Sequence, residues 1–179
     1  TWSGFRPSDD PCTYGYNIPA QLMAVRALRQ IGEFARLWHD QGLADDAAAL
    51  AVEISDGVAK FGVVEGRYAY EVDGLGGQLF MDDANMPSLL SLPLTSDVAA
   101  DDPIYQATRA WVLSPANPYF YEGAAARGIG SPHTPPNYVW HIALAVQGLT
   151  GDAAEARQCL ATILATDGGT GWTHEGFHV

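Results

Sequence analysis

The stretch from 17 to 62, "NIPAQLMAVRALRQIGEFARLWHDQGLADDAAALAVEISDGVAKFG", decides the fold class because it has the pattern of two consecutive helices. Between 17 and 41, apolar side chains recur at steps of three and four residues, the spacing of one helix face: Leu22, Val25, Leu28, Ile31, Phe34 and Trp38. Pro19 suits a first helical turn, and Gly42 suits a stop. A second helix then begins at Asp45 and Asp46 and ends at Gly62, which predicts an antiparallel helical hairpin.

The rest of the chain continues this pattern of helices joined by elaborate loops. Residues 62–80 combine strand-forming residues with glycines and predict a small β-hairpin or a long loop. Helices are expected at 86–92, 103–112, 138–149 and 152–165, and a long loop rich in Pro, Gly and aromatic residues is expected at 114–137. With about six helices arranged as hairpins and no repeat of fixed period, the sequence predicts an all-α domain.

Composition and charge exclude several classes of partner. The chain is 47% apolar and 17% charged, which is typical of a globular domain, and its net charge is −12. Such a charge argues against a nucleic-acid surface and an anionic membrane, and favours a neutral or cationic small molecule. No apolar run approaches the ~20 residues of a membrane span and no leader peptide opens the chain, so we expect a soluble protein of unknown compartment. Cys12 and Cys159 are too few for a disulfide framework.

The run "HEGFH" at 174–178 fits the H-E-x-x-H pattern of zinc hydrolases. That pattern works on a helix, which places both histidines on one face with the glutamate beside the metal-bound water. Here the run follows the glycine-rich "DGGTGWT" and contains Gly176, and both features weaken a helix. We therefore expect no metal or other cofactor, and interpret His174 and His178 as loop residues that orient neighbours or contact a ligand.

Acidic residues gather in several loops of the chain. "RPSDDP" at 6–11 and "MDDANMP" at 81–87 each carry adjacent aspartates, and "YEVDG" at 70–74 carries two more acids. Helix capping explains any one of these, but aromatic residues flank them repeatedly. Aromatic faces combined with acids, amides, Arg and His are the surroundings of a sugar site, although part of the aromatic set belongs to the core.

Glycoside hydrolysis needs two carboxyl groups, one that protonates the leaving oxygen and one that activates water or attacks the anomeric carbon. The acids at Asp9–Asp10 and at Glu175 fill these roles if the fold brings the two ends of the chain together. Stacked helical hairpins place distant loops on one face.

Taken in order, these runs resemble glycoside hydrolase family 125, the metal-independent exo-α-1,6-mannosidases. The resemblance covers nearly the whole chain. It rests on "WSGFRPSDD" at 2–10, "YGYNIPAQLMAV" at 14–25, "YAYEVDGLG" at 68–76, "MDDANMPSLLSLP" at 81–93, "YQATRAWVLSPANPYFYEG" at 105–123, "GIGSPHT" at 128–134, "IALAVQGLT" at 142–150 and "TDGGTGWTHEGFHV" at 166–179.

The resemblance implies a fold, a reaction and a set of site residues. The family fold is an (α/α)6 barrel of twelve helices, so residues 1–179 are expected to be part of a single catalytic domain, truncated at both ends. The reaction is removal of terminal α-1,6-linked mannose from oligosaccharides with inversion and without metal. The general acid falls at Asp9 or Asp10 and the general base at Glu175. The mannoside pocket is expected to include Arg6, Asp82, Asp83, Asn85, His133, Thr134 and His174, although Asp82 or Asp83 could equally cap a helix.

Two residues depart from the family pattern. Gly176 replaces the Ser usual after the base, and His141 stands where Pro is more frequent. The alternatives to an active mannosidase are an inactive fragment of such an enzyme, a related inverting enzyme acting on another sugar, and a zinc hydrolase.

Overall fold

The N-terminal helical hairpin is present, with boundaries that differ from those expected. In the computed structural model, which describes residues 1–179, α1 spans Ile18–Leu37 and α2 spans Gln41–Gly57. The Asn17 side chain caps α1 by accepting from the N–H of Ala20, and Asp40 caps α2 by accepting from Leu43. The first helix therefore ends four residues before the expected Gln41. Gly42 lies inside the first turn of α2, because the turn at residues 38–40 completes the reversal instead.

The contact between α1 and α2 is made by small side chains. Its buried members include Gly32, Ala35, Ala44, Ala47 and Ala51. Of the six apolar residues that recur at helical spacing in this segment, only Val25 is fully buried, and the Trp38 side chain is 76% exposed. Small residues let the two helix backbones approach closely, which turns the larger side chains outward. The expected hairpin is confirmed, and its buried contact is lined by Gly and Ala.

Short strands follow the hairpin. A π-helical turn, η1 (Val58–Gly62), extends α2 to the glycine expected to end it. Strands β2 (Val63–Val64) and β3 (Arg67–Tyr68) form a hairpin. Strands β4 (Glu71–Val72) and β5 (Gln78–Leu79) form another, which β1 (Tyr16–Asn17) joins as an antiparallel edge in the order β1-β4-β5. The β-structure expected at 62–80 is confirmed as two hairpins.

The second half of the chain contains four helices and a further hairpin. The short helix expected at 86–92 is displaced to α3 (Leu92–Thr95), because the backbone N–H groups of residues 89 and 90 bond a buried carboxylate instead. Helix α4 (Pro103–Val112) begins as expected and is capped by Asp102. Within the expected loop 114–137, β6 (Phe120–Glu122) pairs with β7 (Arg127–Ile129).

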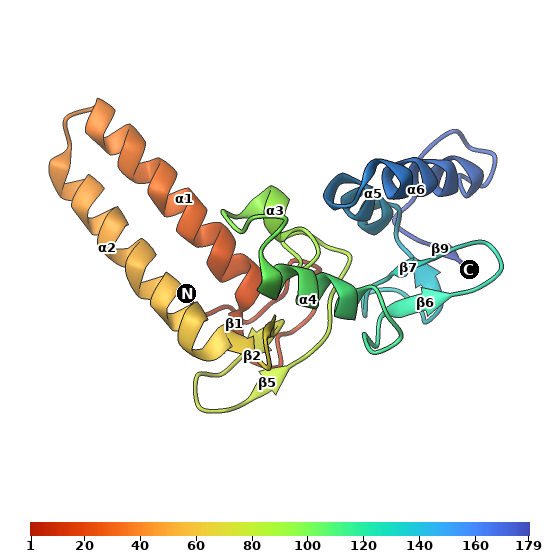
Figure 1. Cartoon of the computed structure of the whole chain (residues 1–179), viewed down its shortest axis with the longest axis horizontal. Helices are drawn as coiled ribbons and strands as arrows, with labels where there is room; N and C mark the ends of the chain where they lie inside the picture. Colours follow the sequence, from red (N-terminus) through yellow and green to blue (C-terminus); the bar gives the residue numbers. More distant parts are fainter.

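The C-terminal helical pair and the chain end complete the fold. Helices α5 (His141–Thr150) and α6 (Ala153–Ala165) confirm the expected pair, with Asp152 as the cap of α6. The expected start at residue 138 is wrong, because β8 (Tyr138–Val139) precedes α5 and pairs with β9 (Phe177–His178). The α1–α2 and α5–α6 hairpins lie at opposite ends of the molecule in Figure 1, with the strands and α4 between them.

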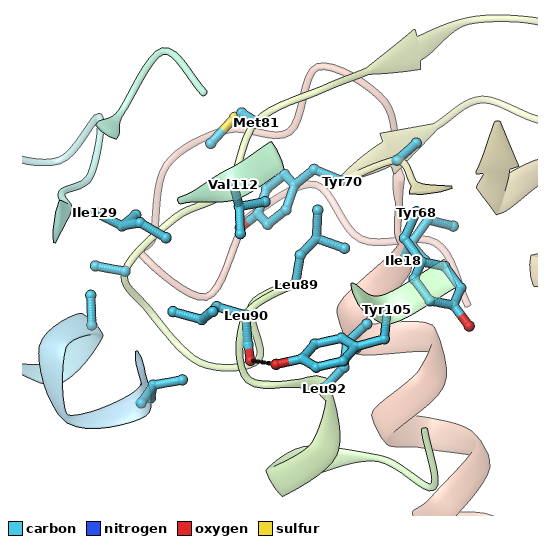
Figure 2. Packing of buried hydrophobic residues seen from close by; sticks show 14 of the residues in the cluster. Ile18, Tyr68, Tyr70, Met81, Leu89, Leu90, Leu92, Tyr105, Val112 and Ile129 are labelled. Carbon is cyan, nitrogen blue, oxygen red and sulfur yellow. Dashed lines mark hydrogen bonds between the residues drawn. The ribbon is translucent and has the colours of Figure 1, made fainter. Parts of the chain in front are cut away.

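The main core lies in this middle region. Figure 2 shows side chains from the strands, from α4 and from the loop before α3 packed together, including Tyr68, Leu89 and Val112. The Tyr105 hydroxyl donates to the carbonyl of Leu90 at 2.9 Å, so the polar end of this buried ring is satisfied. The core thus fixes the loop that carries the acids at 82 and 83 to α4.

The predicted class, mostly helical with about six helices and little strand, is confirmed. Membership of a closed (α/α)6 barrel stays a prediction. None of the helices has the length and apolar character needed to cross a membrane.

Candidate functional site

The "RPSDD" segment forms a tight, closed loop. Phe5 and Pro11 make an isolated β-bridge, the Arg6 N–H donates to the Asp10 carbonyl at 2.8 Å, and the Asp9 N–H donates to the Arg6 carbonyl at 3.0 Å. Asp9 sits at the loop tip with a φ of 65°, a left-handed conformation that Asp tolerates better than most residues. The loop therefore presents its two adjacent carboxylates in different directions.

A buried ion pair holds this loop against the β-sheet. The Arg6 Nε lies 2.6 Å from Glu71 Oε1, and both side chains are buried. The other carboxylate oxygen of Glu71 accepts from the N–H groups of Thr13 and Tyr14. Arg6 was expected in the sugar pocket. Its Nε is instead engaged in positioning the loop that carries the candidate acids.

Asp10 and Asp9 differ in their surroundings. The Asp10 Oδ2 is shielded from solvent, accepts no hydrogen bond from the protein, and lies 3.6 Å from the Nδ1 of His133. Asp9 is exposed. Of the two candidates for the general acid, only Asp10 contacts another residue that the sequence places in the site.

Asp82 holds the turn that precedes α3. Its two carboxylate oxygens accept from the N–H groups of Leu89 and Leu90 at 2.7 and 2.9 Å, and it is completely buried. Burial raises the pKa of Asp82 to about 7, because the loss of water outweighs these two bonds, and the charge of Asp83 adds to the rise. These bonds are not the helix cap that the sequence left open, because residues 89 and 90 precede α3, which begins after Ser91 without a capping side chain.

Asp83 is buried beside a tyrosine that the sequence analysis missed. Its Oδ1 accepts from the backbone and side-chain N–H groups of Asn85, both at 3.1 Å. Its Oδ2 and the hydroxyl of Tyr70 are buried without a hydrogen-bond partner in the protein. Burial, and then the charges of Asp83 and Asp82, hold the pKa of Tyr70 well above its usual range. Tyr70 was assigned to a strand on propensity alone, and nothing in its local sequence distinguishes it from a core residue.

The loop at 128–134 lies next to the loop at 81–85. The Ala84 N–H donates to the Gly130 carbonyl at 3.1 Å. Thr134 accepts a hydrogen bond at 2.9 Å from the indole N–H of Trp140, and the His133 ring lies edge-on to the same indole with centroids 6.5 Å apart. Trp140, buried before α5, thus links the two expected pocket residues His133 and Thr134.

The segment that carries Glu175 also packs against Trp140. A Cβ atom placed on Gly176 would lie 3.0 Å from the indole Cδ1, so the backbone beside Glu175 is in close contact with this ring. Glu175 itself is exposed, and its carboxylate makes no hydrogen bond. A continuous set of contacts therefore runs from Asp10 through His133 and Trp140 to the backbone next to Glu175. The fold thereby connects the loop that carries Asp10 with the segment that carries Glu175.

The geometry of an H-E-x-x-H zinc site does not form. His174 lies in a loop and His178 in β9, so they do not share a helix face. The His174 Nε2 lies 2.8 Å from the Asp167 carbonyl, and the His178 ring packs edge-on against Tyr138. The chain contains no group of three or more His, Cys, Asp or Glu residues placed to hold a metal ion.

The candidate site residues lie outside three cavities of this chain. Three cavities of about 300, 470 and 300 Å³ lie elsewhere, at the β6–β7 tip against α5 and α6, between β1 and α2, and beside η1. Asp10, Asp83, His133 and Glu175 line none of them. We place the candidate site at these residues because Asp10 contacts His133 and the loop of Asp83 is bonded to the loop of His133 through Ala84 and Gly130, while the three cavities hold no comparable set.

The whole chain is similar to known proteins of one family. Residues 1–179 match the family described as metal-independent alpha-mannosidase (GH125). A protein of Schizosaccharomyces pombe, meiotically up-regulated gene 157 protein, is 42% identical over 184 residues, covering 99% of this chain and 36% of its own length.

A solved structure is similar throughout. It is a metal-independent alpha-mannosidase of Streptococcus pneumoniae in a non-productive substrate complex with alpha-1,6-mannobiose, 46% identical with a TM-score of 0.97. The match covers 100% of this chain and 44% of that one, so the chain spans less than half the length of both relatives. With the match extending over every residue, the chain belongs to glycoside hydrolase family 125, the metal-independent alpha-mannosidases.

Proposed function

We propose that residues 1–179 form part of one catalytic domain that releases terminal α-1,6-linked mannose from oligosaccharides, with inversion and without a metal ion. The observation that carries the proposal is the contact path from Asp10 through His133 and Trp140 to the Glu175 segment, which joins two acids 165 positions apart in the sequence. The choice of substrate is supported by the Streptococcus pneumoniae relative, whose structure contains alpha-1,6-mannobiose.

In the proposed reaction, Glu175 takes a proton from a water molecule, and the oxygen of that water attacks the anomeric carbon. The bond from that carbon to the glycosidic oxygen breaks, and the Asp10 carboxyl gives its proton to the departing oxygen. The products are β-mannose and the shortened glycan. Inversion requires the two carboxyl groups to stand about 6.5–9.5 Å apart, leaving room for the water. We assign the acid to Asp10 over Asp9 because Asp10 contacts His133 and its Oδ2 is shielded from water.

The remaining site residues are proposed to divide into two groups. Sugar hydroxyls would meet Asp83, Asn85, His133, Thr134 and Tyr70, because Asp83 Oδ2 and the Tyr70 hydroxyl have no partner in the protein. Arg6, Asp82 and His174 would support the site, since their polar atoms are engaged with Glu71, with residues 89–90 and with Asp167.

The test is release of mannose from α-1,6-mannobiose in the presence of EDTA, with NMR identifying the first-formed anomer. It should be run on this chain and on a version extended to the length of its relatives, with Glu175→Gln as the control. We expect β-mannose from the extended version and loss of release in Glu175→Gln. Full activity in Glu175→Gln would overturn the mechanism, and activity that appears only with added zinc would overturn metal independence. A panel of aryl glycosides separates mannose from other sugars.

A second candidate is that this chain alone is inactive. It is favoured by the large apolar side chains on both helical hairpins, among them Trp38 and Leu149, which are 76% and 71% exposed. Release of mannose by the extended version only would establish this candidate, whereas release by both versions would rule it out.

A further inference from the structure

His141 occupies a buried position between α6 and the segment that carries Glu175. It is the first residue of α5, and only 2% of its surface is exposed. The His174 backbone N–H donates to its Nδ1 at 2.8 Å. Its Nε2 lies 2.8 Å from the Thr166 hydroxyl oxygen, at the end of α6. Both ring nitrogens are therefore engaged, one with the Glu175 segment and one with the helix frame.

These contacts determine the tautomer of the ring. A backbone N–H can only donate, so Nδ1 must be the unprotonated nitrogen and Nε2 must carry the proton. The Nε2–H then donates to Thr166, whose own hydroxyl donates to the Thr162 carbonyl at 2.8 Å. Every donor in this series meets one acceptor, which is the arrangement expected of a neutral histidine held in a single orientation.

We propose that His141 is a positioning residue for Glu175, holding the base segment through the His174 N–H; this rests on the proposed role of Glu175. The Glu175 carboxylate makes no hydrogen bond, so its place depends on the backbone on either side. On the C-terminal side, β9 pairs with β8. On the N-terminal side, the bond to His141 joins the segment to the buried frame of the protein.

The loop before His174 is rich in glycine, so the position of Glu175 depends on an anchor at this end of the segment. Gly168, Gly169 and Gly171 all have positive φ values, and flexible glycines cost more entropy to order than other residues. The other side-chain bonds of this loop link its own residues to Asp167 or to Thr170, so they shape the loop without joining it to the protein core. Removing the anchor would let Glu175 shift, and a displacement of about 1 Å can cost a hundredfold in rate.

The anchor depends on a neutral ring. If Nδ1 of His141 took up a proton, its N–H would face the His174 N–H. Two donors would then meet, and the hydrogen bond between His174 and His141 would be lost. Burial, and then the nearby His174, lower the pKa of His141, while Asp167 acts in the opposite direction. These two are the ionisable groups that face the ring, and the Phe177 ring covers it with centroids 4.9 Å apart. Acidification should therefore release the Glu175 segment only at a pH below the ordinary titration range of histidine.

The kinetic test uses two variants in the extended version. His141→Asn places an oxygen acceptor where Nδ1 stood, whereas His141→Leu fills the space without an acceptor. We expect His141→Leu to lower kcat for α-1,6-mannobiose about 10- to 100-fold with KM within about threefold, and His141→Asn to stay within about threefold of the parent in both. An unchanged kcat in His141→Leu, or an equal loss in both variants, would overturn the inference. Glu175→Gln is measured in parallel. If this variant keeps its activity, the result contradicts the proposed function of Glu175 but does not test whether His141 holds the segment.

A measurement on the unmodified extended version covers the case in which His141→Leu does not fold. Histidine labelled with ¹⁵N reports the tautomer directly by NMR. We expect an unprotonated Nδ1 at neutral pH and a His174 amide signal that moves as His141 titrates, and that movement should vanish in His141→Asn. A protonated Nδ1 at neutral pH, or a His174 amide that ignores the titration, would show that the ring does not hold the segment.

Discussion

At the scale of single residues, the structure separates carboxylates that the sequence leaves equivalent. Asp9 and Asp10 are adjacent, yet one is exposed at a loop tip and the other lies 3.6 Å from His133 with a shielded oxygen. Asp82 and Asp83 are likewise adjacent, yet one binds two backbone N–H groups and the other keeps a free oxygen. Identical side chains therefore serve different purposes according to the backbone that carries them.

The assignment of the acid predicts a dependence on the leaving group. In the extended version, Asp10→Asn should lower kcat/KM for α-1,6-mannobiose about 10²- to 10⁴-fold, because the departing alkoxide loses its proton donor. The loss should shrink for 2,4-dinitrophenyl α-mannoside, whose phenolate leaves without a proton. Asp9→Asn serves as the matched control and should stay near the parent on both substrates. The reverse pattern would move the acid to Asp9.

The buried Asp82 predicts a pH dependence of stability. Its pKa is about 7 in the folded protein against 3.8 when unfolded, so the folded state binds more protons between these values. The associated stability is present below pH 3.8 and is lost as the pH rises through 7. Urea unfolding of this chain should therefore give a free energy that falls from pH 5 to pH 8, and a flatter profile in Asp82→Asn.

The control for that measurement is Asp152→Ala, which removes the acceptor oxygens of an exposed helix cap. Backbone bonds from Glu155 and Ala154 lower the pKa of Asp152, so this group stays charged across the whole window. Its variant should be less stable than the parent by a similar amount at pH 5 and pH 8. If the free energy of unfolding of Asp82→Asn and of the parent changed with pH in parallel, Asp82 would not be the cause of the pH dependence.

At the scale of the elements, Gly130 decides how closely two loops approach. A Cβ placed there would lie 2.0 Å from the Tyr138 carbonyl oxygen and 2.8 Å from the Tyr121 ring. The Gly130 carbonyl also accepts the bond that ties the 128–134 loop to Ala84. Gly130→Ala should lower the free energy of unfolding by about 3 kcal/mol and displace His133. Equilibrium unfolding in urea measures the loss.

Gly57 supplies the matched control. It ends α2 in a right-handed helical conformation, and a Cβ placed there would meet no other atom within 4 Å. Gly57→Ala should be neutral or stabilise by about 0.4–1 kcal/mol, because Ala restricts the unfolded chain. Equal losses in the two variants would mean that the close approach at Gly130 carries no special cost.

The helices also show where sequence periodicity succeeds and fails. It located α1, α2, α4, α5 and α6, because each has helical spacing and all but α5 begin at a capping side chain. It failed to identify the packed face of α1, because an Ala- and Gly-based interface leaves no mark in a pattern of large apolar residues. It also placed a helix at 86–92, where a buried carboxylate redirects the backbone N–H groups.

At the scale of the whole molecule, two helical hairpins extend from a central core, as Figure 1 shows, and carry large exposed apolar side chains. The net charge of −12 opposes association between copies. We therefore expect this chain to bind ANS and to self-associate more in 0.5 M NaCl than in 0.05 M NaCl, because salt screens the repulsion. Sedimentation velocity measures the association, and the extended version is the control. A monomer without ANS binding at both salt concentrations would contradict the expectation.

The sequence by itself determined the helical class, most helix positions and the family, because capping residues, apolar spacing and long ordered motifs are local properties of the chain. Only the tertiary structure decided which side chains meet. Asp10 reaches the Glu175 segment through His133 and Trp140, and Arg6 and Asp82 turn to structural partners, because these contacts join residues far apart in the chain. The proposed anchoring position of His141 likewise depends on contacts between residues far apart in the chain. Its two partners come from separate segments, and no local pattern records that they meet.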